Sequence, residues 1–158
     1  MENISDHITY FEATNSYTAK KRGIDNTPND IQLSNMKRVA KFVFEPMREN
    51  FGIPIYLPSF FRCEKLNEFI GGAEGSQHMA IRGAAIDADA DRYGRITNKD
   101  IFDFIYFNIN YDQLIWEFGT TDNPDWVHAS YIAGENRKEA LRAYRRNKKG
   151  IYISFDLY

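Results

Sequence analysis

Apolar residues recur at steps of three and four after residue 30, which is the spacing of one buried face of an α-helix. The positions are Met36, Val39, Ala40, Val43 and Met47. Thr27-Pro28-Asn29-Asp30 ahead of them has the cap and proline chemistry of a helix start, and Pro46 is expected to kink or shorten the last turn. The pattern therefore predicts a helix whose apolar face belongs to the core.

Two shorter helices are predicted further along the chain. Residues 64–70 have a helical pattern that the pair Gly71-Gly72 ends. Thr97 and Asp100 have the spacing of a capping box ahead of the apolar run "IFDFIYF", so a helix is expected over residues 98–108.

Alternating and β-branched runs predict strands in the rest of the chain. Residues 53–61 are aromatic and β-branched, but Pro54 and Pro58 confine them to an edge or irregular strand. The runs "DQLIWEF" at 112–118 and "DWVHASY" at 125–131 are typical of two strands joined by a turn. We therefore expect an antiparallel hairpin here.

The C-terminal segment fits two structures. Residues 138–146, "KEALRAYRR", suit a helix by propensity, whereas residues 147–150 ahead of "IYISF" suit a hairpin turn, which we favour. Helices followed by antiparallel strands predict an α+β fold, with a small antiparallel sheet and helices packed on one side. A chain of 158 residues is expected to form one domain, residues 1–158.

Composition excludes several classes of protein. The formal net charge of -2 gives no overall attraction to nucleic acid or to a membrane, and we interpret the basic segment 137–149 as a solvated face. The N-terminal residues lack the pattern of an export signal and no membrane span is predicted, so we expect synthesis in the cytoplasm. The single cysteine, Cys63, excludes an internal disulfide and a cysteine-rich zinc cluster. We expect a monomer.

Three alternating aspartates are the first candidates for metal chemistry. Asp87, Asp89 and Asp91 have the rhythm of a calcium loop, but that loop needs glycine at its sixth position and glutamate at its twelfth. Arg92 and Asn98 stand there instead. On a strand the three carboxylates would share one face, either as a solvated acidic edge or as the source of one metal ligand.

Histidines supply the other candidates. His7 lies in a polar stretch and is expected to be exposed, whereas strand alternation puts His128 on one face with Trp126 and Ser130. Considered alone, His128 is interpreted as an ordinary buried histidine that is hydrogen-bonded to a neighbour. Together with His78 and one of the aspartates it would suit a catalytic zinc ion, which takes three protein ligands and keeps a fourth position for water.

Such a site also needs a group that moves protons. Asp125, three residues before His128, has the right chemistry to take a proton from water and pass it to a leaving amine. Glu117 and Asp122 are alternatives. Cys63 is interpreted as structural, because a nucleophilic thiolate would need a histidine that the zinc ion already uses.

Three motifs together resemble a known family. They are "SQH" at 76–78, "GAAID" at 83–87 and "DWVHAS" at 125–130. They are similar to the zinc D-alanyl-D-alanine carboxypeptidase family of peptidoglycan peptidases, which includes phage endolysins and shares its fold with the hedgehog signalling domain. The likeness extends over most of the chain, from residue 26 to the C-terminal basic segment.

The resemblance implies a role for each matching residue. His78, Asp87 and His128 match the family's zinc ligands, and Asp125 matches its catalytic acid and base. Arg62 matches an arginine that meets a substrate carbonyl or carboxylate, although an ion pair of Arg62 with Glu64 or Glu68 is the structural alternative.

The same resemblance makes Ser76 and Gln77 substrate-binding residues. Gly83 and Ala85 match small positions that let a strand approach the metal. Two features depart from the family pattern. Eight residues separate His78 from Asp87 where six are usual, and Phe60 and Cys63 replace smaller or hydroxyl residues around Arg62.

The expected function is that of a zinc-dependent peptidase which hydrolyses an amide bond in peptidoglycan stem peptides. The resemblance implies Zn²⁺ as cofactor and a peptidoglycan peptide as substrate. We expect the protein to act on the cell wall after phage lysis or as a virion component, and a bacterial origin fits equally well. The alternatives are a zinc-binding recognition module without activity and a structural domain without metal.

Overall fold

The predicted long helix is present and extends further than expected. The structure, a computed structural model, describes residues 2–146 and 149–154. The helix consists of α3 (Asp30–Val39), a π-helical turn η1 (Ala40–Phe44) and α4 (Glu45–Phe51). Pro46 cannot donate a backbone hydrogen bond. In the wide turn directly before it, the N–H of Glu45 donates to the carbonyl of Ala40, and this turn accommodates the proline. The helix continues past Pro46 to Phe51, so the expectation that Pro46 would shorten the last turn is wrong, while the alternative of a kink stays a prediction.

The remaining α-helices of the described residues are short. They are α1 (Tyr10–Thr14), α2 (Tyr17–Arg22), α5 (Glu64–Phe69) and α6 (Asn98–Asn108). The capping box of Thr97 and Asp100 at the start of α6 is confirmed, and the Cys63 sulfur accepts the capping hydrogen bond of α5. The sequence pattern misses α1 and α2, because helices of five and six residues are too short to show a helical period.

The described strands form one mixed sheet. They are β1 (Tyr56–Ser59), β2 (Ala84–Asp89), β3 (Gln113–Glu117), β4 (Trp126–Tyr131), β5 (Glu139–Arg146) and β6 (Lys149–Ser154), in the order β1-β2-β4-β3-β5-β6. The hairpin of β3 and β4 is confirmed, and so is the α+β class.

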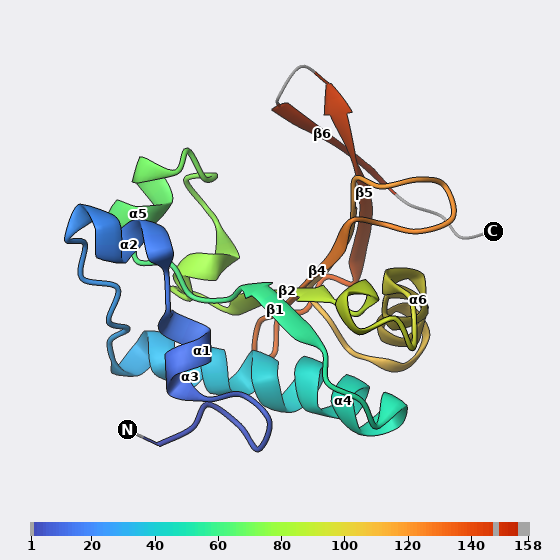
Figure 1. The fold of residues 1–158 in the computed structure, drawn as a ribbon, viewed down its shortest axis with the longest axis horizontal. Helices are drawn as coiled ribbons and strands as arrows, with labels where there is room; N and C mark the ends of the chain where they lie inside the picture. Colours follow the sequence, from blue (N-terminus) through green and yellow to red (C-terminus); the bar gives the residue numbers. More distant parts are fainter. Residues whose placement is uncertain (1, 147–148, 155–158) are drawn as a thin grey trace.

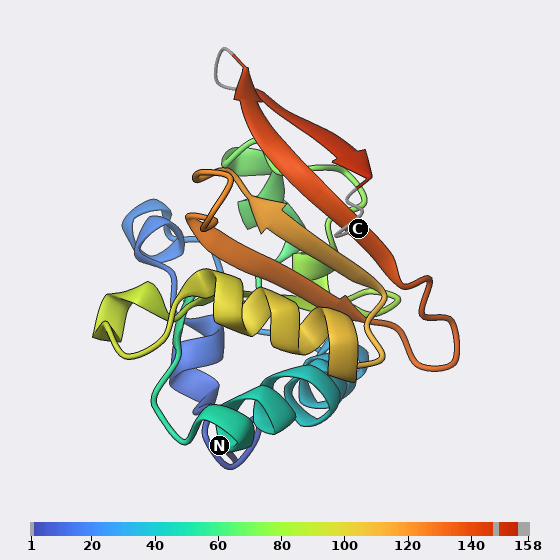
Figure 2. The same cartoon turned by 90° about the vertical axis from the view of Figure 1, so that its right-hand side faces the viewer.

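The expectation of a wholly antiparallel sheet is wrong at one place, because β5 runs parallel to β3. Both edges of β4 are already paired, with β2 and with β3, so the chain that leaves β4 cannot pair with β4 itself and pairs at the free edge of β3. A strand that reverses direction after β4 then runs the same way as β3. β5 and β6 form the expected antiparallel hairpin, which extends away from the helices in Figures 1 and 2. The turn expected at residues 147–150 lies partly outside the described residues.

The two faces of the sheet have different environments. Ile86, Leu114 and Val127 belong to the main hydrophobic core together with residues of α3, η1, α4 and α6. Figure 1 shows α3 and α4 along this face, whereas α2 and α5 lie on the other side. The helices that pack on the central strands thus cover one face, as expected, and the opposite face is available for a site. That the chain is a single domain stays a prediction.

Two short 3₁₀ turns complete the described elements: η2 (Gln77–Met79) and η3 (Asp91–Tyr93). In the part of the chain that the structure describes, no helix has the length and apolar character needed to cross a lipid bilayer.

Gly83 allows close contact between the chain ahead of β2 and the end of β4. A Cβ atom there would lie 2.5 Å from the carbonyl oxygen of Tyr131 and 2.6 Å from a side-chain carbon of Ile132. The small residue is therefore needed for contact with the neighbouring strand.

We expect Gly83→Ala to lower the free energy of unfolding by about 1–3 kcal/mol, because a backbone atom cannot move aside as a flexible side chain can. Gly75→Ala is the matched control, since a Cβ at residue 75 has nothing within 4 Å. Denaturant unfolding of both variants measures the difference. Equal stability of the two variants would contradict the prediction.

Candidate metal centre

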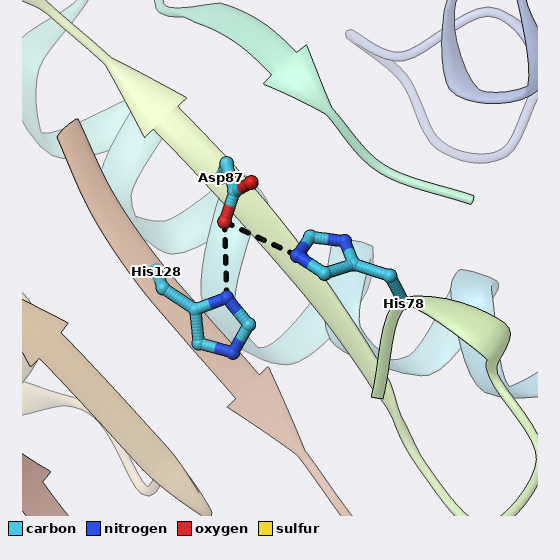
Figure 3. A group of neighbouring side chains, drawn as sticks. All are labelled: His78, Asp87 and His128. Atoms are coloured by element: carbon cyan, nitrogen blue, oxygen red, sulfur yellow. Dashed lines mark hydrogen bonds and ion pairs between the residues drawn. The ribbon is translucent and has the colours of Figure 1, made fainter. Parts of the chain in front are cut away.

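Two imidazole rings and one carboxylate meet on the face of the sheet opposite the long helix. Nε2 of His78 lies 3.2 Å from Oδ1 of Asp87, and Nδ1 of His128 lies 2.9 Å from the same oxygen. Figure 3 shows both rings directed at this one oxygen atom. The potential ligand atoms of the three residues all lie within 4.8 Å of one another.

Strand pairing places two of the three residues. Asp87 on β2 and His128 on β4 are direct partners in the antiparallel register, so their side chains lie side by side on one face. Their sequence neighbours Ile86, Val127 and Ala129 point into the core on the other face. The alternation expected for His128 is confirmed.

The third residue, His78, comes from the turn η2 and is held by its outer ring nitrogen. Nδ1 of His78 lies 2.7 Å from the carbonyl oxygen of Phe60. A carbonyl oxygen only accepts, so this nitrogen carries a proton and Nε2 is the ring nitrogen that faces Asp87. Without an ion Nε2 donates a proton to the carboxylate, and its lone pair would become the ligand when an ion binds. Such an outer hydrogen bond is the usual way in which proteins orient a metal-binding histidine. The side chain of Phe60 itself lies in the core.

The longer segment between His78 and Asp87 is anchored by α3. The Gln32 amide donates to the carbonyl of Met79 at 3.0 Å, and the buried Asn35 amide donates to the carbonyls of Ala80 and Ile81 at 3.0 and 3.2 Å. Ala80 adopts a left-handed conformation with φ of 55°, and the Ile81 side chain is exposed. The extra residues are therefore accommodated without entering the group of His78, Asp87 and His128, although Ile81 lines the cleft around it.

The environment of Asp87 favours its charged form. Burial opposes ionisation, but the charge of His78 and hydrogen bonds from His128 and His78 outweigh it and hold the pKa of Asp87 well below its usual range. A carboxylate that stays ionised at neutral pH is a ready ligand for a divalent cation.

These three residues fit a zinc ion. Two nitrogens and one carboxylate oxygen are the donor set of many catalytic zinc sites. Ligand atoms that are each about 2 Å from a tetrahedral ion lie roughly 3.3 Å apart, which is close to the 2.9 and 3.2 Å separations at Asp87. His78 and His128 are the nitrogen ligands that the arrangement offers, through Nε2 and Nδ1.

The other two aspartates of the alternating run have different partners. Asp89 accepts a hydrogen bond from the Asn98 amide, and Asp91 accepts from Asn98 and from Asn123. Asp91 lies in η3, beyond the end of β2, so the three carboxylates do not share one strand face. Of the candidate aspartates, Asp87 alone is grouped with the two histidines.

The three residues lie in a cleft of about 1100 Å³. Its walls include residues 71–79 on one side, and Ile115, Trp126, Arg137 and Leu141 from the sheet and its C-terminal extension on the other. A cleft of this size is large enough to hold a peptide segment or a small ligand.

Arg62 lines the same cleft as His78, Asp87 and His128, which are called the metal-binding group below. Its Nη2 donates to the Ser76 hydroxyl at 3.4 Å, and its Nε is buried without a hydrogen-bond partner. Burial lowers the pKa of Arg62, and the charge of Asp87 opposes that shift. Among the ion pairs of the described residues, none joins Arg62 to Glu64 or Glu68. Arg62 is thus available for a substrate oxygen.

Sequence reasoning missed the importance of Asp112. This carboxylate is fully buried, and Arg137 donates to it from Nε at 2.9 Å and from Nη2 at 2.8 Å. The Gln77 amide donates to its other side at 2.8 Å. Burial opposes ionisation, but these hydrogen bonds hold the pKa of Asp112 below its usual range. Gln77, expected to bind substrate, thus ties the turn that carries His78 to the sheet.

Two carboxylates compete for the role of proton-transfer group, and they lie in different places. Asp125, favoured by its sequence offset from His128, is exposed and lies just before β4, whereas the residues that line the cleft include Glu117. Burial raises the pKa of Glu117 to about 7, the charge of His128 opposes this rise, and that of Asp87 adds to it.

An α+β domain with two imidazoles and a carboxylate at the floor of a peptide-sized cleft has the design of a metallopeptidase. A family model described as Peptidase M15 matches residues 6–130. The chain belongs to this peptidase family. A comparison with curated proteins finds no match.

The first prediction from this site concerns Asp112. We expect Asp112→Asn to lower the free energy of unfolding by about 1–3 kcal/mol, because a buried amide cannot accept all the hydrogen bonds that Arg137 and Gln77 donate to the carboxylate. Glu135→Gln, which breaks the exposed pair of Arg82 and Glu135, is the control and should cost less than about 1 kcal/mol. Chemical denaturation measures both values. A loss at Asp112 no larger than the control would show that the hydrogen bonds to this buried carboxylate contribute little.

A second prediction uses the raised pKa of Glu117 in the metal-free protein. The folded state binds the carboxyl proton more tightly than the unfolded chain, so this group contributes stability that is present below about pH 4.5 and is lost as the pH rises through about 7. Glutamine does not titrate. As the pH rises from about 4.5 to above 7, we expect the free energy of unfolding of Glu117→Gln to increase relative to that of the wild type by on the order of 3 kcal/mol.

Unfolding curves from pH 4.5 to pH 8 in the presence of a chelator test this expectation. A stability difference between the two proteins that does not change with pH would contradict it.

Proposed function

We propose that the protein is a zinc-dependent peptidase which hydrolyses an amide bond in peptidoglycan stem peptides, as a D-alanyl-D-alanine carboxypeptidase or as an endopeptidase of the endolysin type. The observation that carries the proposal is the convergence of His78, Asp87 and His128 at the floor of a cleft that Arg62 also lines. Membership of the Peptidase M15 family supports the peptidase class. The wall peptide as substrate rests on the sequence resemblance.

The candidate residues would have different roles in such a reaction. His78, Asp87 and His128 would hold the zinc ion, which supplies Lewis-acid polarisation of the scissile carbonyl and of water. Arg62 would bind a carbonyl or carboxylate oxygen of the substrate through its guanidinium group. The resemblance assigns the proton transfer to Asp125.

A non-catalytic zinc-binding module for a virion or for cell-wall recognition is the second candidate. The exposed position of Asp125 outside the cleft lining and the longer segment after His78 favour it. In either case we propose that the protein acts on the wall after phage lysis or as a virion component, or in a bacterium, and that it works as a monomer.

Digestion of purified peptidoglycan tests the proposal. We expect the zinc-loaded protein to release muropeptides whose masses show one cleaved amide bond, and a chelator to abolish this release until zinc is restored. His128→Ala should bind zinc at least 100-fold more weakly and lose activity, because a ligand is removed.

His7→Ala is the matched control and should retain both zinc and activity, since His7 is exposed and pairs with Glu45 far from the cleft. One zinc per chain with no product from any wall preparation would select the non-catalytic module instead.

A further inference from the structure

The position of Glu117 on β3 places it on the same face of the sheet as His128 and in the same cleft as His78 and Asp87. Ile115 pairs with His128 and Glu117 pairs with Trp126 in the antiparallel register of β3 and β4. Strand alternation sends Leu114 and Trp116 into the core, so Ile115 and Glu117 point to the cleft face. The Glu117 carboxyl group therefore lies on the same face as His128, one strand away.

In the described part of the chain, the Glu117 carboxyl group makes no contact that would give it a structural role. Glu117 is 7% exposed and lines the cleft. Among the described residues, no hydrogen bond or ion pair engages its side chain, whereas the half-buried carboxylate of Asp87 and the buried carboxylate of Asp112 each have several partners. Burying a carboxyl group without a partner is costly, and such groups in proteins usually have a functional reason.

Glu117 lies near the metal-binding group without belonging to it. The set of ligand atoms within 4.8 Å of one another contains His78, Asp87 and His128. The charge of Glu117 nevertheless interacts with those of His128 and Asp87. A carboxylate beside three ligands is placed to exchange a proton with water that enters the cleft.

Asp125, by contrast, supports Glu117 through its backbone. The N–H of Asp125 donates to the carbonyl of Glu117 at 2.9 Å, and the carbonyl of Asp125 accepts from the Asn98 amide at 2.9 Å. Its side chain is exposed ahead of β4 and does not line the cleft. The three-residue offset from His128 does not bring this carboxylate to the site.

We propose that Glu117, rather than Asp125, is the catalytic residue that transfers the proton; this assignment rests on the proposed peptidase function. A water oxygen bonds to the scissile carbonyl carbon while Glu117 takes one of its protons. The carbon–nitrogen bond then breaks and Glu117 gives that proton to the leaving nitrogen. The second water proton passes from the new carboxylic acid to the amine, which leaves a carboxylate and an ammonium group.

Matched amide substitutions separate the two carboxylates. We expect Glu117→Gln to lower kcat for muropeptide release by about 10²–10⁴-fold with KM changed less than about threefold, because proton transfer is lost while binding is kept. Asp125→Asn should lower kcat by less than about tenfold. Glu117→Asp keeps a carboxyl group and should recover part of the lost rate. A loss below about tenfold for Glu117→Gln, or a loss for Asp125→Asn that equals or exceeds it, overturns the proposal.

Two readouts do not depend on turnover. The first is the zinc affinity of Glu117→Gln, measured against a competing chelator. It should stay within about threefold of wild type, because the carboxylate is not a ligand. A loss of affinity as large as that of His128→Ala would make Glu117 a ligand and overturn the assignment. With cobalt(II) in place of zinc, the visible absorption should change with pH in the wild type and in Asp125→Asn.

We expect Glu117→Gln to remove or displace that spectral change. If wild type releases no product from any wall preparation, the proposed function fails, and the cobalt spectra still decide the placement of Glu117. A spectral change that Glu117→Gln leaves intact overturns the inference.

Discussion

The register between β2 and β4 is the constraint on which the rest of the structure depends. It makes Asp87 and His128 direct neighbours, and the same pairing sends Ile86 and Val127 into the core. A slip of one residue would bury the ligands and expose the core residues, so hydrophobic packing and the geometry of the metal-binding group stabilise the same register. The strands lie in the middle of the sheet, where both edges are paired. The site thus takes its rigidity from the core beneath it.

The second requirement is to hold His78, which lies on no regular strand. Three contacts from different parts of the chain fix the turn that carries it. The carbonyl of Phe60 binds its ring, α3 holds the carbonyls that follow it through Asn35, and Asp112 holds Gln77 directly before it. The short turn is therefore as well defined as an element of secondary structure. Preorganisation of this kind reduces the cost of ordering a ligand when an ion binds.

Local pattern predicted the parts of the structure that depend on neighbours in sequence. Alternation was enough to place His128 on one face of a strand, and capping chemistry was enough to begin a helix at Asn98. The approach of His78 to Asp87 came from the motif resemblance, because no period relates a turn to a strand. The burial of Asp112 escaped prediction, since it depends on Arg137 and Gln77, which are distant in sequence. The parallel placement of β5 was not predicted, because it depends on which edges of the sheet are already occupied.

The C-terminal part of the chain contributes to the cleft beyond the range that the family model matches. The family match ends at residue 130, yet Arg137 and Leu141 beyond it line the cleft. The three candidate metal ligands and the residues that line the other end of the cleft thus come from separate stretches of the chain. A change in the residues beyond 130 would alter which ligands fit the cleft, while His78, Asp87 and His128 would stay in place.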